Sequence, residues 1–445
     1  MKPTNDETWV HLSISASPKM KSTNNNKTPY SNAAFYIICF FIAFTPLARG
    51  SVHLWSTTLI QTGILMAIIL LILESLKTNK PLFPKTPLTW PLITLILLAL
   101  ISTLLSNHKS LAWEGFLLLL TYIAAYFITQ SSIRTREQQR ILIYVIISTA
   151  LFLSIFGLFK RFGLNPFPFW EYGELKYSPD MLASTYGNHN HLAGFIEMAI
   201  PFLLALFLTR SRSLSAILII IYLILILLAV QALTLSRGGW ISTLGAIVFM
   251  VMVLLSQRKF QSKKLILLLA GSTLVISAFI LASTPIVERV MTLAEKDESA
   301  SMESRLKVWT ETVELIKDHP YIGTGPGTYA AEFTNYQPPG LSFMFIQAHN
   351  DYLHFTADMG LLVIPVMLWI LFIFFKMAFQ NVSDPSRQTR GFALSAMASV
   401  VAILIHSVSD FNLLIPANAL LFTVIAGIVT HKNRSQMDAG FHQNG

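Results

Sequence analysis

Long apolar stretches separated by polar segments recur along the whole chain. An α-helix needs about 20 mostly apolar residues to cross the hydrocarbon core of a bilayer, and most of these stretches approach that length. They are continuous and do not alternate residue by residue, so the pattern favours membrane-spanning helices over a transmembrane β-barrel. We predict twelve spans, at 33–49, 55–73, 88–105, 111–129, 140–159, 191–208, 214–235, 239–256, 264–283, 354–375, 391–410 and 415–430.

The expected fold is therefore all-α, with one polytopic membrane domain over residues 33–430. The beginning of the chain is rich in Asn, Ser, Thr and Lys, and it is too long and too polar for a signal peptide. We expect a disordered cytoplasmic tail at 1–32, an uncleaved first span, and a second cytoplasmic tail at 431–445.

Composition supports a membrane protein. Of the 445 residues, 53% are hydrophobic and only 12% are charged, whereas a soluble domain carries about 25% charged residues. A net charge of +9 would suggest nucleic acid binding in a soluble protein, but here Lys and Arg are expected to mark cytoplasmic loops. Cys39 is the single cysteine, so one chain can form neither a disulfide nor a cysteine metal site.

The basic residues predict an orientation. Lys and Arg fall in every second polar segment between the predicted spans, for example at Arg134, Arg136 and Arg140. The positive-inside rule places those segments, and with them both termini, in the cytoplasm. The longest polar segment, 284–352, then faces outward, which is the periplasm in a Gram-negative cell.

This long outward loop is expected to contain an amphipathic helix over residues 302–318, which His319 and Pro320 end. The Gly-rich run 323–327 follows it. Such runs can bind phosphate through backbone amides, but this one lacks the Lys-Ser/Thr of a nucleotide loop, which favours a plain turn. The apolar stripe of the helix is expected to comprise Leu306, Trp309, Val313 and Ile316.

Ionisable residues within or beside the spans gather at their outward ends. Such groups are costly in lipid and are therefore candidates for function. A transporter more often places them near the membrane midplane, so the asymmetry predicts a site at the outer membrane–water boundary. The residues concerned are Glu114, Glu197, Arg237, His354, Asp358, His406 and Asp410.

Arg237 lies in a short outward turn, Ser236-Arg237-Gly238-Gly239-Trp240. Its guanidinium offers a fork of donors that suits phosphate, and the two glycines allow a ligand to approach the backbone. The alternative is a structural ion pair with Glu197 or Asp410.

His349 stands in the loop just before the tenth predicted span. It is five residues from His354, and the chain has no His-Glu-x-x-His pattern, so a zinc site is not expected there. We predict neither a metal ion nor another cofactor.

Five motifs resemble the O-antigen ligase and polymerase superfamily of bacterial inner-membrane glycosyltransferases, and they occur in the family order. They are Gly187-Asn188-His189-Asn190-His191-Leu192-Ala193-Gly194; Ser236-Arg237-Gly238; Arg305 with Trp309; His319-Pro320 with Gly323-Thr324-Gly325-Pro326-Gly327; and Ala348-His349-Asn350-Asp351-Tyr352-Leu353.

The resemblance implies a periplasmic glycosyltransferase whose donor is a glycan on undecaprenyl diphosphate. Arg237 and Arg305 would bind the diphosphate in place of a metal ion, and His349 would be the general base for an inverting attack. Asp410 would orient His349 or an arginine. For a ligase the acceptor is a sugar of the lipid A core. Further candidates for binding substrate are Asn188, His189, Glu197, Asn350, Tyr352, His406 and Asp410.

Three functions remain open. The ligase pattern of the family continues from His349 and Asn350 through Gly360 to a Gly, Thr or Tyr, where this chain has Val363. A ligase is the first interpretation, and the length of the chain favours it. A polysaccharide polymerase or a protein O-oligosaccharyltransferase of the same superfamily is the second. A polytopic transporter or flippase is an alternative from another class.

Overall fold

The computed structural model describes residues 29–167, 181–209, 213–256, 302–338 and 344–430. Within these ranges the chain forms helices and no strand, which confirms the all-α prediction for the part described. Nine of these helices are long and apolar enough to cross a membrane. They are α1 (Pro29–Leu47), α2 (Leu54–Thr78), α4 (Lys109–Ser132), α5 (Arg136–Arg161), α6 (His189–Thr209), α7 (Leu214–Leu233), α8 (Arg237–Ser256), α14 (Val363–Val382) and α15 (Arg387–His406).

Two shorter apolar helices, α3 (Thr89–Leu105) and α16 (Pro416–Thr430), complete the helical bundle as described. They correspond to the third and twelfth predicted spans. The ninth predicted span, 264–283, and most of both predicted tails lie outside the described residues. The total of twelve spans is therefore not confirmed.

The tenth predicted span, 354–375, is wrong as one continuous helix. The chain forms a separate short helix, α13 (Asp351–Met359), and then begins α14 at Val363. Gly360 between them has a φ of 73°. A Cβ at this position would lie 2.3 Å from the carbonyl carbon of Tyr321, so only glycine permits this contact.

Two further helix ends differ from the prediction, and both concern site residues. Arg237, expected in the turn between two spans, is the first residue of α8. Asp410 was expected to end a span, but α15 ends at His406 and Asp410 lies in the turn that follows.

The helix α15 forms the centre of the bundle, with α6, α8, α14 and α16 packed around it. Its buried positions include many small residues, such as Gly391, Ala396 and Ala398. Small residues allow helix backbones to approach closely in membranes. The Ser399 hydroxyl donates to the backbone oxygen of Met198 across the contact with α6 at 2.6 Å, which ties these two helices together.

The two ends of the bundle differ in chemistry. At one end, which we call the far end, the Glu74 carboxylate accepts from the Ser31 backbone and pairs with Arg134. The first and last described residues, Pro29 and Thr430, also lie at this end, next to the same helix ends. If both termini are on one side of a membrane, Pro29 and Thr430 must lie at the same end of the bundle, and they do.

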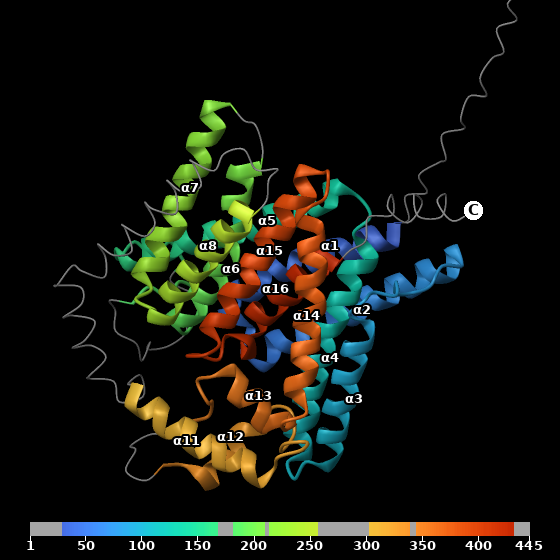
Figure 1. Cartoon of the computed structure of the whole chain (residues 1–445), viewed down its shortest axis with the longest axis vertical. Helices are drawn as coiled ribbons and strands as arrows, with labels where there is room; N and C mark the ends of the chain where they lie inside the picture. Colours follow the sequence, from blue (N-terminus) through green and yellow to red (C-terminus); the bar gives the residue numbers. More distant parts are fainter. Residues whose placement is uncertain (1–28, 168–180, 210–212, 257–301, 339–343, 431–445) are drawn as a thin grey trace, which may run out of the picture.

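At the opposite end, which we call the site end, a small helical unit covers the bundle, and we call it the cap (Figure 1). It consists of α11 (Met302–Asp318), α12 (Tyr329–Glu332), the 3-10 helix η4 (Phe333–Tyr336) and α13. The predicted amphipathic helix 302–318 is confirmed as α11.

The buried face of α11 differs in part from the predicted stripe. Ile316 is buried as predicted, but Leu306 and Val313 are 51% and 39% exposed. The other buried positions are Ser304, Val308, Thr312 and Leu315, which also follow helical spacing. The physical reason is the Tyr329 hydroxyl, which hydrogen-bonds Thr312 at 2.7 Å and gives the buried threonine a polar partner.

The Gly-rich run 323–327 is a structural turn, as predicted. The Asp358 carboxylate accepts from the Gly327 and Tyr329 backbone N–H groups at 2.7 and 3.1 Å. The Gly325 N–H donates to the backbone oxygen of Asp358 at 2.8 Å. These amides are thus used within the cap and are not offered to a phosphate.

We predict that Gly360→Ala lowers the free energy of unfolding by more than about 1 kcal/mol, because Ala is strained at this positive φ and its Cβ meets the Tyr321 backbone. The matched control is Gly163→Ala, where φ is 72° but nothing lies within 4 Å of a Cβ. Thermal unfolding of the purified variants measures both. An equal loss in the two variants would show that the contact with Tyr321 contributes nothing.

Candidate active site

The site is built around the turn between α15 and α16, residues 407–415. Asp410 lies in this turn with its side chain 1% exposed. Its Oδ1 is 3.8 Å from His349 Nδ1 and 4.0 Å from His191 Nε2. The Phe411 ring contacts both imidazoles, with centroids 4.8 Å from His191 and 4.9 Å from His349. The turn thereby brings α6 and the cap together at one carboxylate.

His349 adopts a backbone conformation that is rare for a residue with a side chain. Its φ is 49°, in the left-handed region, which costs of order 1 kcal/mol and persists only where the surroundings impose it. The residues after it supply that constraint. Asn350 caps α13 by accepting from Leu353 N at 3.1 Å, and the Asp351 carboxylate accepts from Ser407 Oγ at 2.7 Å and Leu413 N at 3.1 Å. His349 is thus clamped against the Asp410 turn.

The charge states follow from burial and neighbours. Burial lowers the pKa of His349 to about 4 despite the nearby Asp410 carboxylate, and Arg305 lowers it further. The imidazole is therefore neutral at neutral pH and can accept a proton. Burial alone would raise the pKa of Asp410, but His191, Arg305 and His349 outweigh it and hold that pKa at about 2. Asp410 is therefore a carboxylate.

The side chains of His349 and Asp410 do not use all their hydrogen-bonding atoms. Among the described residues, His349 Nδ1 and Asp410 Oδ2 have no hydrogen-bond partner. At 3.8 Å the pair is longer than a hydrogen bond, as is common for catalytic pairs that tighten when substrate binds.

Arg305 reaches the same turn from the first turns of α11. Its Nη1 donates to the Ser409 backbone oxygen at 2.7 Å. Its Nε has no hydrogen-bond partner in the part of the chain that the structure describes. Four residues on, Trp309 Nε1 donates to the Ala348 backbone oxygen at 2.9 Å, next to His349. One helix of the cap therefore positions both Arg305 and His349.

Arg237 approaches from the other side of the turn. It is exposed at the start of α8, and the residues on both sides of it contact the end of α15. Ser236 Oγ lies 3.5 Å from His406 Nε2, and a Cβ on Gly238 would lie 2.8 Å from Ser409 Oγ. The residues beside Arg237 therefore pack against the same stretch, His406 to Ser409, whose backbone the Arg305 guanidinium binds.

Glu197 and His406 lie behind this turn. Their side chains are 0% and 1% exposed, and His406 Nδ1 is 3.0 Å from Glu197 Oε2. Ser242 Oγ also donates to Glu197, and Ser236 Oγ accepts from Gly239 N at 3.1 Å. The structure therefore brings the predicted Glu197 and His406 together as a buried support for the Arg237 turn, and not at a surface that a substrate reaches.

The other predicted binding residues make hydrogen bonds to the backbone near the site. Asn188 Oδ1 accepts from Asn190 N at 2.8 Å at the start of α6, and His189 hydrogen-bonds the Thr234 backbone. Asn350 is the helix cap described above. Tyr352 donates to the Leu404 backbone oxygen at 2.7 Å and is 39% exposed. Each makes a hydrogen bond that fixes the backbone, so its contact with substrate stays a prediction.

Sequence reasoning missed His191, Phe411 and Asp351 as members of the site. His191 belongs to the motif 187–194, and its position two residues after His189 could have signalled a second histidine on another face of the same helix. The other two stand beside residues that were selected. In the described residues, no three His, Cys, Asp or Glu side chains are grouped so that they could hold a metal ion.

Residues 221–368 match a family model described as O-antigen ligase. This range runs from α7 into α14 and contains Arg237, Arg305 and His349. The match confirms the resemblance to the O-antigen ligase superfamily. With the apolar helices, it supports a multi-pass bacterial membrane protein that transfers lipid-linked glycans. No curated protein matches the chain.

We predict that Glu197→Ala destabilises the protein by about 1–3 kcal/mol, because the buried His406 loses its hydrogen-bond partner. Glu197→Gln, which keeps one acceptor, should cost less. Glu114→Ala is the matched control, since Glu114 is an exposed carboxylate at the same end of the bundle. Thermal unfolding compares the three, and equal midpoints for Glu197→Ala and Glu114→Ala would contradict the supporting role.

Proposed function

We propose that this protein is an O-antigen ligase-like glycosyltransferase. It moves a glycan from undecaprenyl diphosphate to a sugar of the lipid A core, without a metal ion and with inversion at the anomeric carbon. The observation that carries the proposal is the meeting of a neutral His349, a buried Asp410 carboxylate and the Arg305 guanidinium at one turn. Such a set offers a base, an orienting group and a cation for an anionic leaving group.

His349 removes the proton of the acceptor hydroxyl. Its Nδ1 faces Asp410 at 3.8 Å, so Asp410 favours the tautomer with the proton on Nδ1 and leaves Nε2 as the acceptor. The acceptor oxygen forms a bond to the anomeric carbon as the bond from that carbon to the diphosphate oxygen breaks. The proton ends on Nε2, and Asp410 stabilises the resulting imidazolium.

Arg237 and Arg305 bind the diphosphate and neutralise the charge that develops on it as the glycan leaves. The Arg305 guanidinium binds the Ser409 backbone, and Gly238, the residue after Arg237, packs against Ser409 from another part of the fold. Arginine retains its charge and offers a planar fork of donors, which suits a diphosphate. A single displacement at the anomeric carbon inverts its configuration.

The site end faces the periplasm in this proposal, with both termini in the cytoplasm of a bacterial cell. The distribution of Lys and Arg supports this orientation. The donor lipid then lies in the outer leaflet of the inner membrane, and its diphosphate reaches the seam between bundle and cap.

The departure from the ligase pattern at Val363 falls on a packing position. Val363 begins α14, is 1% exposed, and packs in an apolar cluster with Leu98 and Phe116. A change there alters the contact of α14 with α3 and α4, so it does not by itself favour a polymerase. A polymerase or a protein O-oligosaccharyltransferase would use the same donor chemistry and differ in the acceptor. A transporter is disfavoured because the ionisable groups gather at one end of the bundle.

Deleting the gene is predicted to leave the lipid A core unmodified while lipid-linked polymer accumulates, as seen on a lipopolysaccharide gel. Complementation with His349→Ala, Arg305→Ala or Arg237→Ala should fail, because each removes the base or a phosphate-binding cation. Lys307→Ala is the matched control, since Lys307 lies on the same helix as Arg305 but pairs with Glu303 in solvent. It should restore the wild-type ladder.

Two other gel patterns would contradict the ligase. A core that carries a single repeat would indicate a polymerase, and a normal ladder with lost protein glycosylation would indicate a protein transferase. Full activity in all three site variants would contradict the mechanism, whether the protein is a ligase, a polymerase or a protein transferase.

A further inference from the structure

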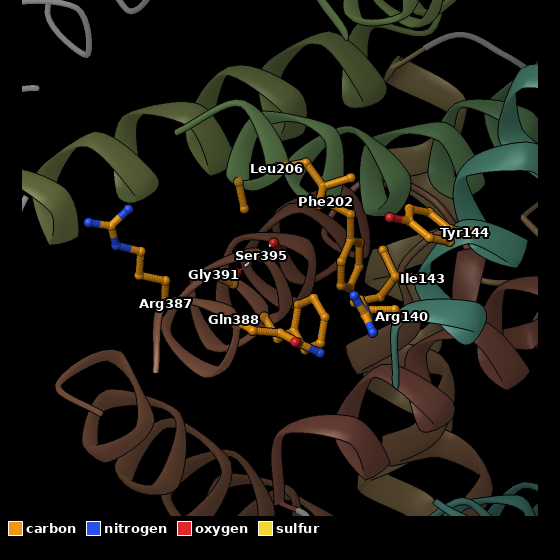
Figure 2. A pocket seen from close by; sticks show the side chains of 11 residues that line it. Arg140, Ile143, Tyr144, Phe202, Leu206, Arg387, Gln388, Gly391 and Ser395 are labelled. Atoms are coloured by element: carbon orange, nitrogen blue, oxygen red, sulfur yellow. Dashed lines mark hydrogen bonds between the residues drawn. The ribbon is translucent and has the colours of Figure 1, made fainter. Parts of the chain in front are cut away.

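A cavity lies at the far end of the bundle, at the opposite ends of the helices that build the site. It has a volume of about 240 Å³ and opens between α5, α6 and α15 (Figure 2). Both α6 and α15 run from this cavity to the Asp410 turn. The cavity shares no residue with the site described above.

The charged side chains in the wall are both basic. In Figure 2, Arg140 of α5 and Arg387 of α15 stand on opposite sides of the α15 surface at Gly391. Among the described residues that line the cavity there is no Asp or Glu. Arg140 pairs through Nη2 with the largely exposed Glu137, whereas its buried Nε has no hydrogen-bond partner in the described part of the chain. The cavity therefore has donors and positive charge for an anion.

The remaining wall is apolar. Ile143, Phe202, Leu206 and Phe392 line it, and they come from all three helices. Such a wall disfavours an inorganic anion, because the anion would lose part of its hydration shell against hydrocarbon. A ligand with an anionic head and an apolar tail matches both parts.

We propose that this cavity binds the head group of an anionic glycerophospholipid, with the phosphodiester between Arg140 and Arg387 and an acyl chain along Phe202 and Leu206. Charge complementarity supports this occupant, and so does the place of the cavity between the ends of three helices that are long and apolar enough to cross a membrane. Basic pockets between transmembrane helices bind acidic lipid head groups in this way. The lipid would join α5 to the central pair α6 and α15.

The test uses the full chain purified in detergent and titrated with phosphatidylglycerol or with phosphatidylcholine of the same acyl chains. Native mass spectrometry measures the tightest lipid adduct. Phosphatidylglycerol should bind more tightly, and Arg140→Gln with Arg387→Gln should weaken it by at least about tenfold, the effect of losing one charge-assisted hydrogen bond. The double variant with Lys at both positions should retain most of the binding.

Lys85→Gln is the matched control, because it removes one exposed positive charge at the same end of the bundle but outside the cavity. It should leave the affinity for phosphatidylglycerol unchanged. Equal binding of the two lipids would overturn the proposal. So would an affinity for phosphatidylglycerol that Arg140→Gln with Arg387→Gln leaves unchanged. Displacement of the lipid by millimolar inorganic phosphate would also overturn it, since the cavity would then be a simple anion site. If the Gln pair fails to fold, the Lys pair still tests it: loss of phosphatidylglycerol preference there would overturn the proposal.

Discussion

Asp410 holds a carboxylate in a turn where only 1% of the side chain is exposed, and a buried charge must be compensated by its surroundings. The Phe411 backbone N–H donates to it at 2.8 Å, and Arg305 and the histidines at 191 and 349 surround it. Each of these comes from a different segment of the chain. Asp410 is therefore the point at which α6, the cap and the α15–α16 turn meet.

The bundle and the cap each supply part of the candidate site around Asp410. The bundle supplies the buried carboxylate and, behind it, the Glu197–His406 pair that supports the Arg237 turn. The cap supplies Arg305 and His349, which α11 holds through hydrogen bonds to the Ser409 and Ala348 backbones. The candidate site therefore lies where the bundle meets the cap, and both parts contribute charged or titratable groups to it.

The apolar stretches predicted most of the described helices, and the amphipathic pattern predicted α11 with its ends. The break at Gly360 could not be read from hydropathy, because the apolar stretch continues across it and the cause is a backbone contact with Tyr321. The buried face of α11 was predicted only in part, for a related reason. Thr312 is buried against the Tyr329 hydroxyl, and a tertiary hydrogen bond leaves no trace in hydrophobic periodicity.

The site was predicted in part. The positions of the ionisable residues along the spans predicted that Arg237, Glu197, His406 and Asp410 lie at one end of the bundle. The structure places all four there. Sequence could not separate the buried Glu197 and His406 from groups that face a substrate, because depth along a helix says nothing about which face is covered. His191 was missed since it needs the Asp410 turn, over 200 residues away in sequence, to acquire a role.

In the proposed mechanism Asp410 acts through His349. A double-mutant cycle with His349→Ala and Asp410→Asn tests this, through the rate at which purified protein transfers glycan from a lipid-linked donor. Asn keeps an acceptor for the Phe411 N–H, so the turn should remain folded. We expect the double variant to be no slower than His349→Ala alone. A double variant slowed by the product of the two single effects would contradict it, because Asp410 would then act independently of His349.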